Sequence, residues 1–185
     1  VQEGIEVFLD TEKVQRNREM VLELLLAQAP KASKLLTDLA EYYGVEETRF
    51  PKVGEEKCIL CGLCTRACDE LIGAHALTFS GRGDEKNVGS PYGEASSTCI
   101  GCGVCAEVCP TDAVPLEFDY KKGTRKIWDR EFELIPCREC GTPTIPKEQK
   151  EWLVARSGLD ESYFELCDSC RRKATVEQFK AVMGK

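Results

Sequence analysis

Eight cysteines in the middle of the chain form two runs with the same spacing. The runs are CILCGLCTRAC at 58–68 and CIGCGVCAEVC at 99–109, and they align without a gap. Each has the spacing C-x2-C-x2-C-x3-C, with three cysteines on a tight loop and a fourth beyond it. A cubane [4Fe–4S] cluster needs four thiolates, of which one such loop can supply three. The two runs therefore predict two [4Fe–4S] clusters.

The fourth cysteine of each run is expected to ligate the cluster of the other run, because it points away from its own loop. One predicted ligand set is Cys58, Cys61, Cys64 and Cys109. The second predicted ligand set is Cys99, Cys102, Cys105 and Cys68. Gly62, Gly101 and Gly103 let the loop backbone wrap close to the sulfur atoms. Pro110 follows the last cysteine, whereas Asp69 stands at the matching place in the first run, a difference that can alter the surroundings of that cluster.

Four more cysteines lie near the C-terminus as two CxxC pairs. They are Cys137, Cys140, Cys167 and Cys170. Such pairs are the usual signature of a four-cysteine zinc site. Zinc ribbons hold their pairs on β-hairpins, however, whereas the residues between these pairs have a helical pattern, and the rest of the chain already predicts clusters. We therefore expect a third [4Fe–4S] cluster in the tail, with one zinc ion as the alternative.

Composition and charge narrow the setting. Twelve cysteines, behind a charged opening segment with no apolar signal region, indicate metal ligands in a reducing cytoplasm rather than disulfides. The net charge of −7 argues against a nucleic-acid partner. No stretch is long and apolar enough to predict a transmembrane segment. The only histidine, His75, is expected to stay outside the ligand sets, because cysteines already fill them.

Helical patterns flank the cysteine runs. Over residues 11–50 the apolar positions repeat at helical spacing, Pro30 ends a first helix, and Ser33 is a candidate cap for a second one that stops at Gly44. The predicted apolar stripe of these helices is Val14, Val21, Leu22, Leu25, Leu26, Leu35, Leu36, Leu39, Ala40 and Tyr43.

The second half of the chain has a mixed pattern. Residues 114–135 predict a β-hairpin that turns at KKGT and returns over 127–135. A helix is expected over 146–158 and a short helical turn over 160–166. Thr175 with Gln178 predicts a capping box that starts the final helix.

These elements predict an α+β fold with a bacterial two-cluster ferredoxin-like core. N-terminal helices precede that core, and a C-terminal helical four-cysteine metal-binding extension follows it. The predicted segments are 1–50 (helical), 51–135 (two clusters and the hairpin) and 136–185 (the metal-binding tail).

The cysteine runs, with CDELIGAHALTFSGRG and PYG between them, resemble the large iron–sulfur subunit of respiratory NADH dehydrogenases and the N-terminal part of iron-only hydrogenases. The resemblance covers roughly residues 11–120 and begins at REMVLELLLAQAP. In that family, one histidine and three cysteines hold a further cluster among the helices. Here Ala29 stands at the place of the histidine and KASKLLTD has no cysteine, so we expect that cluster to be absent.

The two runs together with the tail PCRECG…CDSC look most like the small iron–sulfur subunits of tungsten-containing class II benzoyl-CoA reductases. That resemblance implies three [4Fe–4S] clusters, the third at the tail cysteines. It also implies a large tungstopterin catalytic subunit of the aldehyde oxidoreductase type and further redox subunits as partners. The chain itself would be a non-catalytic electron-transfer subunit, serving the ATP-independent reduction of benzoyl-CoA to a cyclic dienoyl-CoA.

Two other interpretations stay open. One is an electron-transfer subunit of a hydrogenase, formate dehydrogenase or NADH dehydrogenase complex. The other, from a different class, is a structural zinc-binding adaptor.

The crossed ligation can be tested by exchanging the fourth cysteine of each run. We expect Cys68→Ser to damage the cluster of the second run and Cys109→Ser that of the first, because each residue ligates the opposite cluster. Paramagnetic resonance of the reduced variants would show which cluster signal is lost. Loss confined to each residue's own run would contradict the crossing.

Overall fold

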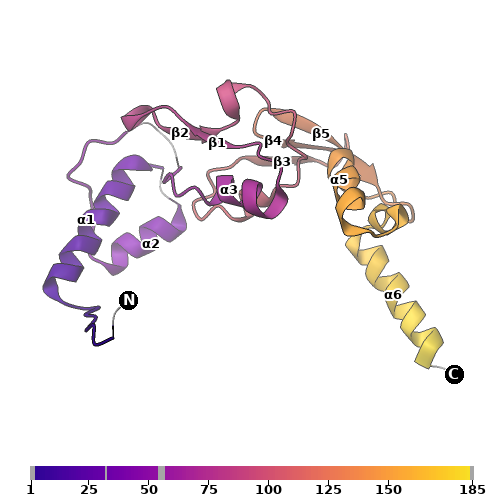
Figure 1. Ribbon diagram of the computed structural model, residues 1–185, viewed down its shortest axis with the longest axis horizontal. Helices are drawn as coiled ribbons and strands as arrows, with labels where there is room; N and C mark the ends of the chain where they lie inside the picture. The colour runs from indigo at the N-terminus through magenta and orange to yellow at the C-terminus, as the bar shows by residue number, and fades with distance from the viewer. Residues whose placement is uncertain (1–2, 32, 54–56, 184–185) are drawn as a thin grey trace. The chain divides into compact units, whose positions relative to one another are not determined.

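The computed structural model describes residues 3–31, 33–53 and 57–183 (Figure 1). Their contacts divide them into two compact units. The first takes in the described part of Val1–Gly62, with Arg82–Glu85 and Cys109–Ala113. The second comprises Leu63–Gly81, Lys86–Val108 and Val114–Lys185, as far as these are described. The predicted segments 1–50, 51–135 and 136–185 partition the chain differently and stay a prediction.

The first unit is built on two helices, α1 (Glu12–Gln28) and α2 (Lys34–Tyr42). The Ser33 hydroxyl accepts a hydrogen bond from the Leu36 amide, which confirms the predicted cap. Gly44, just past α2, has φ of 70°, as a residue that ends a helix in the left-handed conformation requires. Both helix ends therefore lie where the sequence predicted them.

An apolar core joins the two helices. It consists of Leu22, Ala29, Leu36, Ala40 and Val45, with Leu25, Leu26, Tyr43 and Ile59 packed against it. Ala29 is fully buried, so the position at which the resembling family has a histidine ligand is part of the core here. Ile59 lies between Cys58 and Cys61, so the core also anchors the first cysteine loop.

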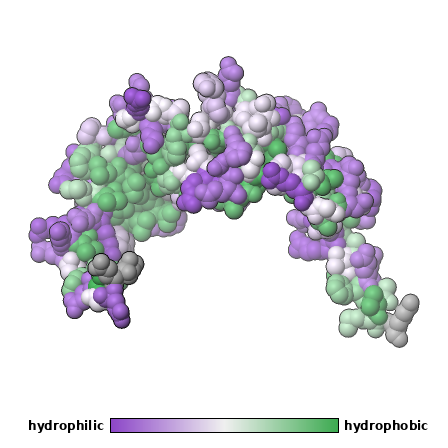
Figure 2. Space-filling view, viewed as in Figure 1, coloured by the Kyte–Doolittle hydropathy of each residue, from purple (hydrophilic) through white to green (hydrophobic). Residues whose placement is uncertain are grey.

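The predicted apolar stripe was partly wrong. Val21, Leu35 and Leu39 are exposed, at 54%, 50% and 40%. The helices meet through a narrower contact than the pattern suggested, and the excess apolar side chains face solvent. Figure 2 shows apolar side chains gathered over this unit.

The second unit begins with short helices that carry the cysteines. These are α3 (Leu63–Arg66), the π-helical turn η1 (Ala67–Ile72) and α4 (Val104–Glu107). A small antiparallel ribbon of β1 (Thr78–Ser80) and β2 (Asn87–Gly89) also belongs to this unit. Two single 3₁₀ turns, η2 (Gly83–Glu85) and η3 (Pro91–Gly93), complete the segment between the cysteine runs.

A four-stranded antiparallel meander follows. Its strands are β3 (Leu116–Asp119), β4 (Thr124–Ile127), β5 (Arg130–Pro136) and β6 (Pro143–Pro146), in that order across the sheet. The predicted hairpin is present as β3 and β4. The predicted single return strand was wrong, because Trp128, with φ of 52°, turns the chain between β4 and β5.

Three helical elements end the chain. They are α5 (Lys147–Ser157), η4 (Glu161–Glu165) and α6 (Asp168–Met183). Pro146 and Gly158 bound α5 as predicted. The predicted start of the last helix at Thr175 was wrong, since α6 already runs from Asp168 and the Thr175 hydroxyl donates to the Arg171 carbonyl within it. Among the described helices, none combines the length and hydropathy needed to span a membrane.

Adjacent leucines on α2 offer a matched test of the helical core. We expect Leu36→Ala to lower the free energy of unfolding by about 2–4 kcal/mol, because Leu36 is 3% exposed and its loss leaves a cavity. Leu35→Ala, one residue away and half exposed, should change it by less than about 0.5 kcal/mol. Urea unfolding followed by circular dichroism measures both. Equal effects would show that the helices do not pack as described.

Candidate metal centres

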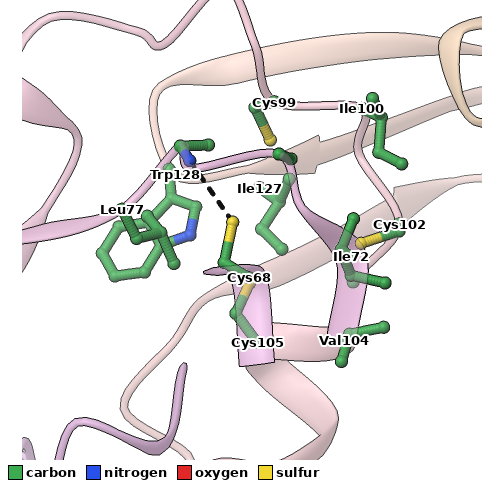
Figure 3. A pocket seen from close by; sticks show the side chains of 13 residues that line it. Cys68, Ile72, Leu77, Cys99, Ile100, Cys102, Val104, Cys105, Ile127 and Trp128 are labelled. Atoms are coloured by element: carbon green, nitrogen blue, oxygen red, sulfur yellow. Dashed lines mark hydrogen bonds between the residues drawn. The ribbon is translucent and has the colours of Figure 1, made fainter. Parts of the chain in front are cut away.

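A pocket in the second unit brings together the four cysteines of one predicted ligand set. Its wall includes Cys99, Cys102 and Cys105 of the second run (Figure 3). Cys68, the last cysteine of the first run, reaches the same pocket from η1. This is the juxtaposition that crossed ligation requires.

The pocket is apolar apart from its sulfur atoms. Ile72, Leu77, Ile100, Val104 and Ile127 line it. Burial here raises the pKa of the Cys99 and Cys102 thiols and raises that of Cys105 to about 12. Ionised thiolates in such a place need a positively charged metal or cluster to compensate the lost hydration.

Trp128 supplies an observation that fits a bound cluster. Its indole Nε1 is buried at the wall of this pocket and makes no hydrogen bond of ordinary geometry within the described residues. The indole does lie near enough to Cys105 to offset a part of the rise that burial causes in the pKa of that thiol. A buried donor without a well-placed partner is costly. A thiolate or sulfide in the pocket is the kind of acceptor that would satisfy it.

Both cysteine loops depend on left-handed backbone at matching positions. Leu60 and Gly62 in the first loop have φ of 54° and 74°, and Gly101 and Gly103 in the second have 68° and 81°. This conformation turns backbone N–H groups toward the sulfur atoms. In the first loop, the Leu60 amide donates to Cys58 Sγ at 3.4 Å.

The fourth cysteines receive equivalent hydrogen bonds. The Ala76 amide donates to Cys68 Sγ at 3.4 Å, and the Ala113 amide donates to Cys109 Sγ at 3.2 Å. The preceding residues, His75 and Asp112, both have left-handed backbone. The duplicated motif is therefore matched in its hydrogen bonds as well as in its spacing.

The two runs differ after the fourth cysteine. Pro110 cannot continue a helix, and the chain turns at once after Cys109. Asp69 at the matching position allows η1 to run on to Ile72, where Gly73 ends it with φ of 70°. The exposed His75 pairs through Nδ1 with the Asp69 carboxylate, which places it away from the sulfur atoms.

The other predicted set is divided between the units. Cys58, Cys61 and Cys109 belong to the first unit, and Cys64 lies on α3 of the second. Its assembly into one site stays a prediction.

The tail cysteines converge. Cys137 and Cys140 lie in the turn between β5 and β6, Cys167 precedes α6, and Cys170 lies in its first turn. Their four Sγ atoms all lie within 4.8 Å of one another. Backbone N–H groups, those of Cys167 and then Cys140, lower the pKa of Cys137 to about 6, which favours its thiolate.

Comparisons with known proteins agree with the cysteine pattern. Residues 57–113 match the family described as the 4Fe-4S dicluster domain. Ferredoxin-3 of Rhodobacter capsulatus is 37% identical over 76 residues, which are 33% of this chain and 73% of that protein. The chain belongs to the 4Fe-4S dicluster ferredoxin family.

Larger relatives extend beyond this domain. An NADH-quinone oxidoreductase component of Rhizobium meliloti, its G 2 polypeptide, is 30% identical over 183 residues, which are 84% of this dicluster ferredoxin but only 21% of that relative. A solved chain of an NAD⁺-reducing [NiFe]-hydrogenase in its H₂-reduced state superposes with a TM-score of 0.52. It is 27% identical, and the match covers 61% of this chain and 59% of that one. The predicted relationship to NADH dehydrogenases is thus supported, whereas benzoyl-CoA reductase rests on the sequence resemblance alone.

Two arginines that hold the second loop of the dicluster domain were missed from the sequence. Arg130 donates through one nitrogen to the carbonyls of Ser96, Ser97 and Cys99, at 3.1, 3.0 and 2.7 Å. Arg125 donates to the Gly101 carbonyl at 2.8 Å. Both come from the sheet, and only the pairing of β4 with β5 brings them to the loop, so no local pattern signals them.

Gly101 permits a direct test of how the sheet supports this loop. A Cβ at Gly101 would lie 2.7 Å from the Phe132 ring, whereas one at Gly44 would meet nothing within 4 Å. We expect Gly101→Ala to destabilise the loop by about 1–3 kcal/mol beyond the left-handed strain that Gly44→Ala shares. Iron content and cluster absorbance should fall in Gly101→Ala and persist in Gly44→Ala. Equal cluster content in the two variants would contradict this packing.

Proposed function

We propose that this dicluster ferredoxin carries electrons as part of a larger redox complex of the NADH dehydrogenase and hydrogenase type. The observation that supports this most directly is the pocket that brings Cys68 beside Cys99, Cys102 and Cys105. A [4Fe–4S] cluster held there would accept and release single electrons. Because each run would lend a cysteine to the other run's cluster, the two centres would lie close enough to exchange electrons.

The residues around the pocket suit this role. The apolar side chains exclude water, so little solvent would have to reorganise when charge changes. N–H groups directed at sulfur stabilise negative charge on it. Arg125 and Arg130 add positive charge beside Cys102 and Cys99, which favours the reduced state of a centre bound there.

Substrate chemistry is assigned to a partner. Of the potential ligand groups in the described residues, only the tail cysteines lie close enough together to hold a single ion. The sequence has no nucleotide-binding glycine fingerprint. We therefore assign catalysis to a separate subunit or domain, and expect the isolated chain to show no turnover with NADH, hydrogen, aldehydes or benzoyl-CoA.

A second candidate is the small subunit of a tungstopterin enzyme that reduces benzoyl-CoA. The tail favours it, because its four cysteines form an ordered site appended to the dicluster domain, as that resemblance implies. The two candidates share the electron-transfer role and differ in the partner. Identifying the catalytic subunit that copurifies under anaerobic conditions, and its metal, separates them.

The electron-transfer role is tested in the assembled complex. Cys102→Ala should abolish electron delivery between the donor and the catalytic site, because it removes a ligand of the second centre, while substrate binding by the partner persists. Lys126→Gln, an exposed change on β4, should leave the rate within about twofold. Stopped-flow reduction of the catalytic centre measures both. A Cys102→Ala complex that transfers electrons at the full rate would refute the proposed function.

A further inference from the structure

The first tail pair lies in a tight β-turn, as a metal-binding knuckle requires. Across the turn from β5 to β6, the Cys137 amide donates to the Thr142 carbonyl at 2.8 Å, and the Gly141 amide donates to the Cys137 carbonyl at 2.9 Å. Gly141 has φ of 73°. The helical pattern between the pairs argued against zinc, but β6 was not foreseen, and the first pair does sit on a hairpin.

The second pair lies at the start of a sixteen-residue helix. The Cys167 amide donates to Cys137 Sγ at 3.3 Å, and the Cys170 amide donates to Cys167 Sγ at 3.4 Å. The positive end of the α6 dipole faces the same sulfur atoms. A hairpin turn and a helix start thus present two cysteines each to one point.

The spacing of the sulfur atoms distinguishes one ion from a cubane. Tetrahedral zinc with bonds of about 2.3 Å puts its four sulfurs about 3.8 Å apart. A cubane binds each thiolate at a different iron atom, which spreads the sulfurs to roughly 6 Å. Here all four Sγ atoms lie within 4.8 Å of one another, and those of Cys140 and Cys167 are 3.6 Å apart.

The other cysteines of the chain provide an internal contrast. Cys68, Cys99, Cys102 and Cys105 surround an apolar pocket, yet within the described residues they do not form a comparably tight group. One chain therefore shows two arrangements of four cysteines. The wide one has room for a cluster, and the tight one has room for a single ion.

We propose that Cys137, Cys140, Cys167 and Cys170 bind one zinc ion, not a third cluster, in a closed structural site. Zinc has no redox chemistry and favours a tetrahedral set of four thiolates. The tail would then take no electrons itself. It would fix the end of β5 to the start of α6.

Contacts around the site match a structural role. The Arg138 amide donates to the Glu165 carbonyl at 2.9 Å, which ties the knuckle to the segment before α6. Lys150 on α5 pairs with Glu161 and Glu165 at 2.7 and 3.2 Å. Cys137 and Cys170 are buried, so the ion would be enclosed by protein on those sides.

Metal analysis of the full-length chain, purified without oxygen, tests the proposal. We expect about eight iron, about eight sulfide and about one zinc per chain, since each cubane brings four of each. A reductive titration should take up about two electrons per chain, one for each cluster. About twelve iron without zinc would overturn the proposal, and so would about nine iron without zinc, which would indicate a single iron ion.

Matched variants locate the zinc. Cys140→Ala should lose the zinc and keep the iron, whereas Cys102→Ala should lose iron and keep the zinc. If Cys140→Ala does not fold, the metal content and electron count of the unaltered chain still decide. The result is independent of the proposed electron transfer, because a zinc tail can accompany an active or an inactive pair of clusters.

Discussion

The constraint on which this structure depends is that four thiolates must meet at one inorganic centre. Thiols in an apolar pocket hold their protons strongly, as the raised pKa values of Cys99, Cys102 and Cys105 show. The chain therefore has to supply N–H groups and positive charge at the sulfurs. Left-handed backbone at Leu60, Gly101 and their neighbours meets the first need in both loops.

The sheet meets the second need and fixes the loop in place. Arg125 and Arg130 reach the loop carbonyls from β4 and β5, and Phe132 lies so close beneath Gly101 that no side chain fits there. Removing the sheet would remove both the charge and the surface on which the loop rests. The ferredoxin-type loop and the sheet are thus one structural unit, although 24 residues separate Arg125 from Gly101.

Local signals allowed much of this to be predicted. The spacing of the cysteines, Ser33 as a cap, Gly44 and Gly158 as helix ends and the KKGT turn all act within a few residues. What was missed depends on longer range or on ambiguous patterns. Thr175 with Gln178 has the composition of a capping box but lies inside α6, because a threonine hydroxyl can also bond back to the preceding turn. β6 was missed because its four residues include two prolines, and it exists only through pairing with β5.

Strand β5 has a consequence for how such a protein is made. Its first residue, Arg130, holds the Cys99 loop, and Cys137 follows directly after its last residue, Pro136. Seven residues of strand span about 20 Å, so one rigid segment ends at a metal site on each side. A metal taken up early by the tail would order this strand and with it the empty second loop. Maturation could then proceed from the C-terminal end inward, with the loop already shaped when its iron and sulfide are delivered.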